Sequence, residues 1–121
     1  MDDTYDFTLY IKHKSLDDIR RMISEELDAE ITADDRNHLE FQFSNDGLGH
    51  LEGFAFVTDG GSGEDIILTP YCFSGDLLSW VDLVWGVFAK NTQYDLRLEQ
   101  TDPPVIRYRI DGVVSEEPVA A

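Results

Sequence analysis

The side chains of this chain that could do chemistry are three histidines, one cysteine and 25 carboxylates. His13, His38 and His50 could bind a metal ion together with carboxylates, but no two of them have the four-residue spacing that places two ligands on one helix face. Because Cys72 is the only cysteine, a thiolate cluster is excluded. The loop 59–65 is rich in oxygen atoms but lacks the ordered ligand positions of an EF-hand. We therefore predict neither a metal site nor a cofactor.

Asp82 is the best candidate for a catalytic residue, since a carboxylate buried on an apolar helix is a plausible general base. The alternative is that Asp82 faces solvent or pairs with an arginine, of which the candidates are Arg97, Arg107 and Arg109. The sequence contains no G-x-S-x-G motif, no glycine-rich phosphate loop before a helix and no Cys-His arrangement of recognisable spacing. We predict no catalytic residues and no enzymatic activity.

The negative charge of the chain is concentrated in its middle. Between Met22 and Ala89 there are 14 carboxylates and one arginine, and they account for most of the net charge of −16. The 53 residues from Asn37 to Ala89 contain no lysine or arginine. A field of one sign attracts basic partners and repels nucleic acid and anionic lipid. We therefore predict a protein partner with a basic surface, and binding to neither nucleic acid nor membranes.

The acidic surface that we expect to contact this partner belongs to the first helix and the loop after it. Its residues are Asp17, Asp18, Glu25, Glu26, Asp28, Glu30, Asp34 and Asp35. Between Ser24 and Asp35 there are six acids and no base, so neighbouring cations do not relieve the repulsion. The alternative is a solvated face that serves only to keep the protein in solution.

Hydrophobic alternation indicates the strands that must position these residues. Apolar and polar residues alternate over 5–12, 39–44, 94–99 and 106–110, which is the period of a half-buried strand. The segment 51–58 follows turn residues and is the predicted hairpin partner of 39–44. The segment 65–73 has apolar residues at alternate positions of both kinds, so both faces of this strand are apolar. This favours a central strand, with an irregular end at Pro70.

Two helices are predicted from apolar residues at helical spacing. Leu16, Ile19, Ile23 and Leu27 form one stripe, which predicts a helix from Leu16 to about Ala29 with Ser15 as its N-cap. The second helix is expected over 76–90, with Ser74 or Asp76 as its cap. Its apolar residues surround most of its circumference and leave only a narrow polar stripe of Ser79, Asp82, Gly86 and Lys90. Such a helix is either covered on several sides or shared with a partner, so a homodimer is one option.

The predicted order is β-α-β-β-β-α-β-β, which indicates the α+β class. We expect a mainly antiparallel sheet of about six strands, with both helices on one face and the other face polar and wet. Residues 1–121 form a single acidic domain. Thr32–Asn37 is expected as a polar connection, and the residues from about 113 as a loose C-terminal tail.

Cys72 lies in an apolar run and is expected to be a small buried residue in a reducing compartment. The acidic N-terminus and the lack of a long apolar segment favour a cytoplasmic protein. The last two predicted strands carry Arg97, Arg107 and Arg109 at their polar positions. With Lys12 they are expected on the open face of the sheet, in cross-strand ion pairs.

The chain resembles the small immunity proteins that bacteria encode beside polymorphic and contact-dependent toxins. The features that carry the resemblance are the small acidic α+β domain, the lack of a catalytic motif, and the strand-to-helix segment from Leu68 to Trp80. The resemblance implies a cytoplasmic protein that binds a cognate toxin domain, often a basic nuclease, and blocks its active site. It transfers no site residues to this sequence.

Two other functions are compatible with the sequence. A DNA mimic of the anti-restriction or anti-CRISPR type would use the same charge against a nucleic-acid-binding groove, and would need carboxylates in two rows at phosphate-like spacing. A small enzyme or ligand-binding domain would need a deep pocket lined by Trp80 or Trp85, with Asp82 buried in it.

Overall fold

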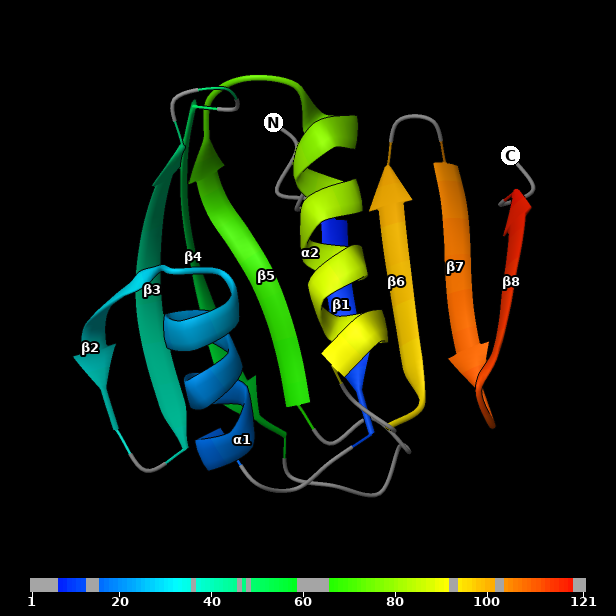
Figure 1. Cartoon of the computed structure of the whole chain (residues 1–121), viewed down its shortest axis with the longest axis horizontal. Coiled ribbons are helices and arrows are strands. Elements are labelled where there is room, and N and C mark those ends of the chain that lie inside the picture. The colour runs from blue at the N-terminus through cyan, green and yellow to red at the C-terminus, as the bar shows by residue number, and fades with distance from the viewer. Residues whose placement is uncertain are drawn as a thin grey trace.

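The fold is an open antiparallel sheet with two helices on one of its faces (Figure 1). This computed structural model describes residues 7–12, 16–35, 37–45, 47, 49–58, 66–91, 94–101 and 104–118. The strands are β1 (Phe7–Ile11), β2 (Glu30–Asp34), β3 (His38–Asn45), β4 (Gly49–Val57), β5 (Ile66–Phe73), β6 (Leu96–Thr101), β7 (Pro104–Ile110) and β8 (Val113–Pro118). The helical segments are α1 (Leu16–Arg21), η1 (Met22–Glu26) and α2 (Leu77–Asn91).

The strand order is β2-β3-β4-β5-β1-β6-β7-β8, and every neighbouring pair is antiparallel. This confirms the α+β class and the antiparallel sheet, but the described residues form eight strands rather than about six. As predicted, β5 is central, since it pairs with β4 on one side and with β1 on the other.

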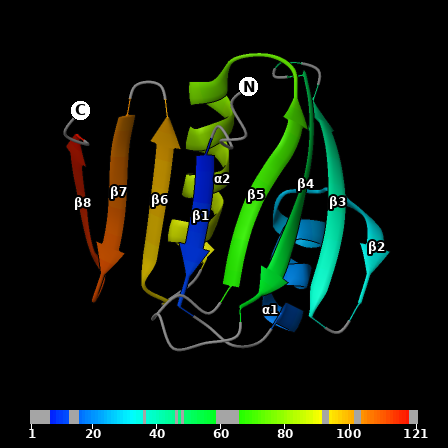
Figure 2. The ribbon, with the colours of Figure 1, turned by 180° about the vertical axis from the view of Figure 1, so that it is seen from behind.

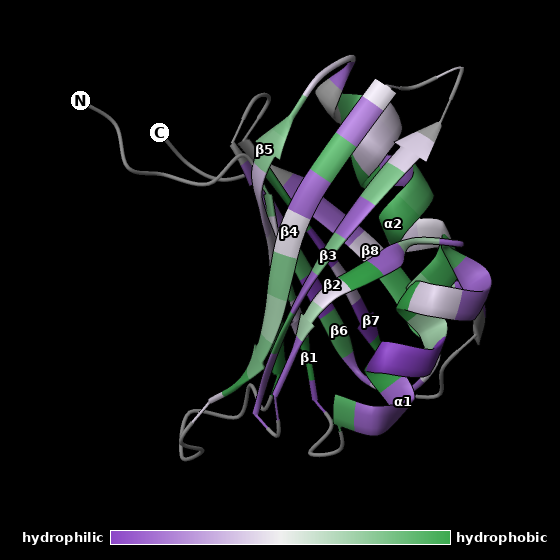
Figure 3. Cartoon of the chain, turned by 90° about the vertical axis from the view of Figure 1, so that its left-hand side faces the viewer, coloured by the Kyte–Doolittle hydropathy of each residue, from purple (hydrophilic) through white to green (hydrophobic). Residues whose placement is uncertain are grey.

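The core lies between the helices and one face of the sheet, as the edge-on view shows (Figure 3). Its largest fully buried side chain is Trp80 of α2. The indole Nε1 donates a hydrogen bond to the carbonyl of Ser74 at 2.7 Å, and the ring packs edge-on against Phe43. Asp76 caps α2, because its carboxylate accepts hydrogen bonds from the backbone N–H and the hydroxyl of Ser79.

The first helix changes its winding after Arg21. Residues Met22–Glu26 form a π-helical turn, in which the N–H of Leu27 bonds to the carbonyl of Met22 at 3.1 Å. The predicted stripe of Leu16, Ile19, Ile23 and Leu27 is buried, as expected. The helix does not continue to Ala29, because Asp28 adopts a left-handed backbone conformation with φ of 58°. The predicted cap Ser15 lies outside the described residues.

Two edge strands were missed by the sequence analysis. The expected polar connection begins within β2, which pairs with β3 through Ile31 opposite Phe41 and shifts register before Ala33. β2 is an edge strand, and most of its residues are exposed. Because few of its side chains face the core, its alternation of apolar and polar residues is weak. The expected tail from 113 is instead largely β8.

The turn between β7 and β8 carries a sequence signal from which the second missed strand, β8, could have been predicted. Asp111 and Gly112 both have positive φ, at 53° and 81°, and Ile110 pairs directly with Val113 across them. This is the geometry of a two-residue type I′ turn, for which Asp-Gly is a favoured sequence.

A bulge at Pro70 redirects the end of β5. Glu52 pairs with Cys72 while Gly53 pairs with Pro70, so Tyr71 is an extra residue on the β5 side. A Cβ atom on Gly53 would lie 2.7 Å from the carbonyl oxygen of Thr69, which explains the glycine at this close approach. The bulge confirms the expected irregularity, but it also leaves Cys72 exposed rather than buried.

The open face of the sheet is not uniformly polar, which corrects a second expectation. One row of directly opposed residues crosses neighbouring strands from β7 to β3, in the order Tyr108, Arg97, Tyr10, Ile67, Phe56 and His38. The side chains of β7 point to the opposite faces from those predicted, so the parity of this strand is inverted. Ile106, Tyr108 and Ile110 therefore share the open face, whereas Arg107 and Arg109 lie opposite the core positions Leu98 and Leu96.

We expect that Ile23→Ala lowers the free energy of unfolding by about 2–4 kcal/mol, because the fully buried side chain would leave a cavity. The matched control is Val113→Ala on β8, where the side chain is 67% exposed; its cost should stay below about 0.5 kcal/mol. Urea denaturation at neutral pH measures both values. Equal costs for the two variants would mean that α1 and η1 are not part of the core.

Candidate functional site

The predicted acidic surface forms one corner of the molecule, where α1, η1 and β2 meet. Asp17 and Asp18 lie on α1, Glu25 and Glu26 on η1, and Asp28 in the turn that follows. Of the remaining three, Glu30 and Asp34 are the first and last residues of β2, and Asp35 comes directly after it. The structure thus brings the predicted residues together, but it does not leave them all equally available.

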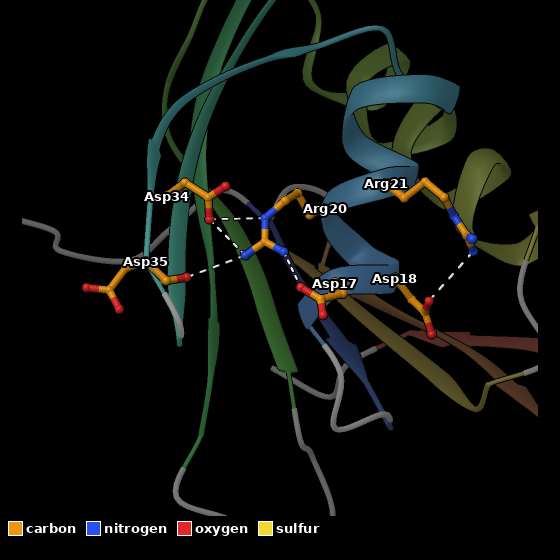
Figure 4. Close-up of polar contacts among 6 residues, drawn as sticks. All are labelled: Asp17, Asp18, Arg20, Arg21, Asp34 and Asp35. Atoms are coloured by element: carbon orange, nitrogen blue, oxygen red, sulfur yellow. Dashed lines mark hydrogen bonds and ion pairs between the residues drawn. The ribbon is translucent and has the colours of Figure 1, made fainter.

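Arg20 neutralises part of this corner (Figure 4). Its Nη2 atom lies 2.7 Å from the carboxylate of Asp34, and its Nε donates to the same oxygen at 3.0 Å. Its Nη1 pairs with Asp17, one turn earlier on α1, and Nη2 also donates to the backbone carbonyl of Asp35 at 3.4 Å. The hydrogen bond to Asp17, together with Asp34, raises the pKa of Arg20 above its usual range. Arg20 therefore joins α1 to the edge strand β2.

Asp18 is also engaged within the molecule. Its carboxylate accepts a hydrogen bond from the hydroxyl of Tyr94 at 3.0 Å and lies 3.7 Å from Arg21. Partial burial and then the bond to Asp18 raise the pKa of Tyr94. On β2, the carboxylate of Glu30 accepts a bond from the side-chain amide of Gln42 at 2.7 Å.

The four remaining carboxylates are exposed. Three of them, Glu25, Glu26 and Asp28, form what we call the acidic ridge, and the fourth, Asp35, follows β2. The ion pairs among the described residues involve none of these three. Glu25 and Glu26 lie in the π-helical turn, and Asp28 follows it with a left-handed backbone conformation. Sequence reasoning included these residues but could not separate them from the paired carboxylates of α1 and β2.

A groove lies beside the acidic ridge, between η1 and α2. It has a volume of about 410 Å³ and is lined by Glu26, Asp82, Leu83, Gly86, Val87 and Lys90. The polar stripe predicted on α2 supplies Asp82, Gly86 and Lys90, all of which are exposed. A Cβ atom on Gly86 would meet nothing within 4 Å, so the glycine keeps this wall open. The sequence predicted the stripe but not the groove.

The candidate catalytic residue is not buried. The side chain of Asp82 is 65% exposed and pairs with Arg107 at 2.9 Å, as the alternative interpretation expected. Trp80 is completely buried and Trp85 is 9% exposed. This geometry lacks the desolvation that a carboxylate base on α2 would require.

No group of three or more potential metal ligands occurs among the described residues. His50 instead contacts Glu52 at 3.2 Å and the hydroxyl of Ser44 at 3.0 Å. His38 lies beside the ring of Phe54. His13 and the loop 59–65 lie outside the described residues.

The predicted group of basic residues is divided between the two faces. Arg97 lies over the ring of Tyr10 on the open face, at 4.2 Å from the ring centre. Arg107 is on the helix side, where it bridges Asp82 of α2 and Glu116 of β8. Arg109 is also on that side and is buried. The prediction of one shared basic face is wrong because the parity of β7 is inverted.

Comparison of this chain with protein-family models, curated proteins and solved structures finds no match. No helix among the described residues has both the length and the apolar character needed to span a membrane. The function must therefore be argued from the charges and surfaces described above.

We expect that Arg20→Gln lowers the free energy of unfolding by about 1 kcal/mol, because two carboxylates lose a shared cation. Hydrogen exchange should show that the amides of β2 lose protection first. Arg21→Gln is the control, since its pair with Asp18 is longer and more exposed; its cost should be below about 0.5 kcal/mol. Unchanged protection of β2 in Arg20→Gln would show that the edge strand does not need this arginine.

Tyr94→Phe should cost about 1–2 kcal/mol near neutral pH, because Asp18 loses its hydroxyl donor. Since the folded state raises the pKa of Tyr94, the stabilisation is complete below the ordinary tyrosine pKa of about 10 and is lost as the pH rises through the raised value. The difference between wild type and variant should therefore shrink at alkaline pH. Denaturant titrations across this range measure it, and a constant difference would contradict the role of the hydroxyl proton.

Proposed function

We propose that this protein is a non-catalytic binding protein of the immunity type, which neutralises a basic protein toxin by covering its active site or substrate cleft. The observation that carries the proposal is the acidic ridge beside the groove on α2. Such a role belongs to the cytoplasm, where a toxin that cleaves nucleic acid would act. The toxin domain must expose cations in order to bind its own substrate.

The ridge and the groove would serve different steps of binding. Exposed carboxylates raise the association rate by attracting a cationic surface over several ångströms, an effect that salt screens. The groove then offers the half-buried side chains of Leu83 and Val87 for apolar contact. Glu26, which none of the ion pairs above involves, lies at the same groove, so a lysine or arginine of the partner could insert its aliphatic part and keep its charge near this carboxylate.

The alternatives gain less support from the arrangement of residues. A DNA mimic needs rows of available carboxylates, whereas Asp17, Asp18 and Asp34 are used in ion pairs within the molecule. An enzyme or ligand-binding domain centred on α2 needs Asp82 to be buried, and this residue is exposed. Self-association through α2 would depend on a small apolar surface, of which Leu78, at 40% exposed, is the main large member.

The ridge, together with the neighbouring exposed carboxylate of Asp35, can be tested with the variant Glu25→Gln, Glu26→Gln, Asp28→Asn and Asp35→Asn. We expect wild type to retain a basic partner from a lysate of the source organism, and the variant to lose it. With the purified partner, the association rate constant of the variant should fall by about tenfold at low salt, and its salt dependence should flatten. The fold should persist, because removing clustered charge reduces repulsion.

The charge-matched control carries amides at four other acidic positions, Asp95, Asp102, Asp111 and Glu117. It loses the same charge between residues 95 and 117, so a uniform charge effect would slow both variants alike. Equal salt slopes for wild type and the ridge variant would remove the ridge from the interface. Capture of a DNA-binding groove protein, in place of a toxin, would favour the DNA-mimic function.

A further inference from the structure

The open face of the sheet carries a cluster of aromatic rings, which we call the aromatic cluster: Phe54, Phe56 and Tyr71. The centre of the Phe54 ring lies 5.7 Å from that of Phe56 and 5.9 Å from that of Tyr71. The planes of Phe56 and Tyr71 are tilted by 29° and 24° from that of Phe54, so each of them stacks on the central ring with a moderate tilt. His38 extends the cluster on β3, at 6.1 Å from Phe54.

The aromatic cluster is accessible to solvent, whereas most aromatic rings of a folded domain are buried in its core. The two helices lie on the far side of the sheet when it is viewed from its open face (Figure 2). Tyr71 is 47% exposed, and Phe54 and Phe56 are half-buried. The bulge at Pro70 places Tyr71 beside Phe54, because it adds a residue to β5 at this point. An apolar group exposed in this way on a sheet face is a feature of binding surfaces.

Carboxylates border the aromatic cluster on the same face. Glu40 lies directly opposite Phe54 in the β3–β4 register. Glu52 accepts a hydrogen bond from the hydroxyl of Tyr71 at 3.4 Å. Partial burial, followed by the charges of Glu52 and Glu40, raises the pKa of Tyr71, which places both carboxylates within electrostatic reach of its hydroxyl. The cluster therefore combines aromatic faces with negative charge.

The same face already holds one arginine in an arrangement of this kind. The guanidinium of Arg97 lies 4.2 Å from the centre of the Tyr10 ring and contacts Glu99 at 3.2 Å. Tyr10 and Phe56 are separated by Ile67 alone in the row of opposed residues. An aromatic ring with an adjacent carboxylate is thus a combination that binds a guanidinium on this very surface.

We propose that the aromatic cluster, with Glu40 and Glu52, is a docking site for arginine side chains presented by a basic protein segment. A planar guanidinium can stack on an exposed ring of this cluster and also bond to a carboxylate through two N–H groups. The ammonium of lysine is compact and strongly hydrated, so it gains less from the rings. A second copy of this chain is a poor occupant, since each copy carries a net charge of −16. The site lies on the face opposite the groove and does not depend on the proposed toxin.

Blocked hexa-arginine and hexa-lysine peptides provide the test, with dissociation constants measured by calorimetry at a single low ionic strength. Wild type should bind the arginine peptide about fivefold more tightly than the lysine peptide. In the variant Phe54→Thr, Tyr71→Thr this preference should fall to about one, because threonine keeps the strand while removing the rings. The control variant Glu25→Gln, Glu26→Gln, Asp28→Asn should raise the dissociation constants of both peptides by the same factor and keep the preference for arginine.

The remaining outcomes are equally decisive. Equal affinities of wild type for the two peptides, or a preference that survives in the double variant, would overturn the proposal. A wild-type dimer in sedimentation that becomes a monomer in the double variant would also overturn it, because a second copy would then occupy the cluster. If the double variant does not fold, Tyr71→Ser at the most exposed ring replaces it and should reduce the preference by about half. Loss of toxin binding without loss of the arginine preference would affect only the proposed function.

Discussion

Burial of α2 against the middle of the sheet is the constraint on which the rest of the structure depends. Trp80, Val84 and Phe88 of this helix are at most 1% exposed. A helix with its side chains is about 10 Å wide, whereas neighbouring strands lie about 4.8 Å apart, so one helix covers about two strands. Two helices, α2 and the continuous α1 and η1, cannot cover the eight described strands in this way. The outer strands must therefore be held by interactions other than helix packing.

Arginines meet this requirement at both ends of the sheet. Arg20 connects α1 to Asp34 of β2 at one edge. At the other, Arg107 connects Asp82 of α2 to Glu116 of β8. Each cation is shared by two carboxylates, so part of the acidity of the chain serves to attach edge strands. Of the eight carboxylates predicted for the acidic surface, those outside the ion pairs include the three on η1 and in the turn after it. Structural pairing thus distinguishes the acidic ridge from its neighbours, which sequence composition could not reveal.

Most of the fold could be predicted because strong hydrophobic periods survive in the sequence. The alternation around Leu9, Phe41 and Leu98 marks strands with one buried face, and Ile19 and Ile23 mark a helical stripe. The missed features are those in which a local pattern is weak or is overridden. The edge strand β2 has few apolar residues, and the parity of β7 cannot be deduced from alternation when both faces carry large side chains.

The candidate site was predicted in composition but not in arrangement. All eight acidic residues were identified, yet their division between ion pairs and the ridge depends on where Arg20 and Arg21 point. The groove requires two segments that are distant in sequence, one contributing Glu26 and the other Gly86. The aromatic cluster was missed because Phe54 and Phe56 are apolar residues that alternation assigns to either face with equal ease. Only the register with β5 and the bulge at Tyr71 place them together.

The strong charge and the exposed rings are physically compatible features of one molecule. An apolar sheet face exposed on a neutral protein would favour association of identical copies. Here every copy carries a net charge of −16, and Glu40 and Glu52 border the rings themselves. Bringing two such faces together would force like charges into a desolvated interface, which costs several kcal/mol. The same carboxylates lower the energy of a cationic partner at that face. The acidity therefore opposes self-association through the aromatic cluster and favours cations at that face.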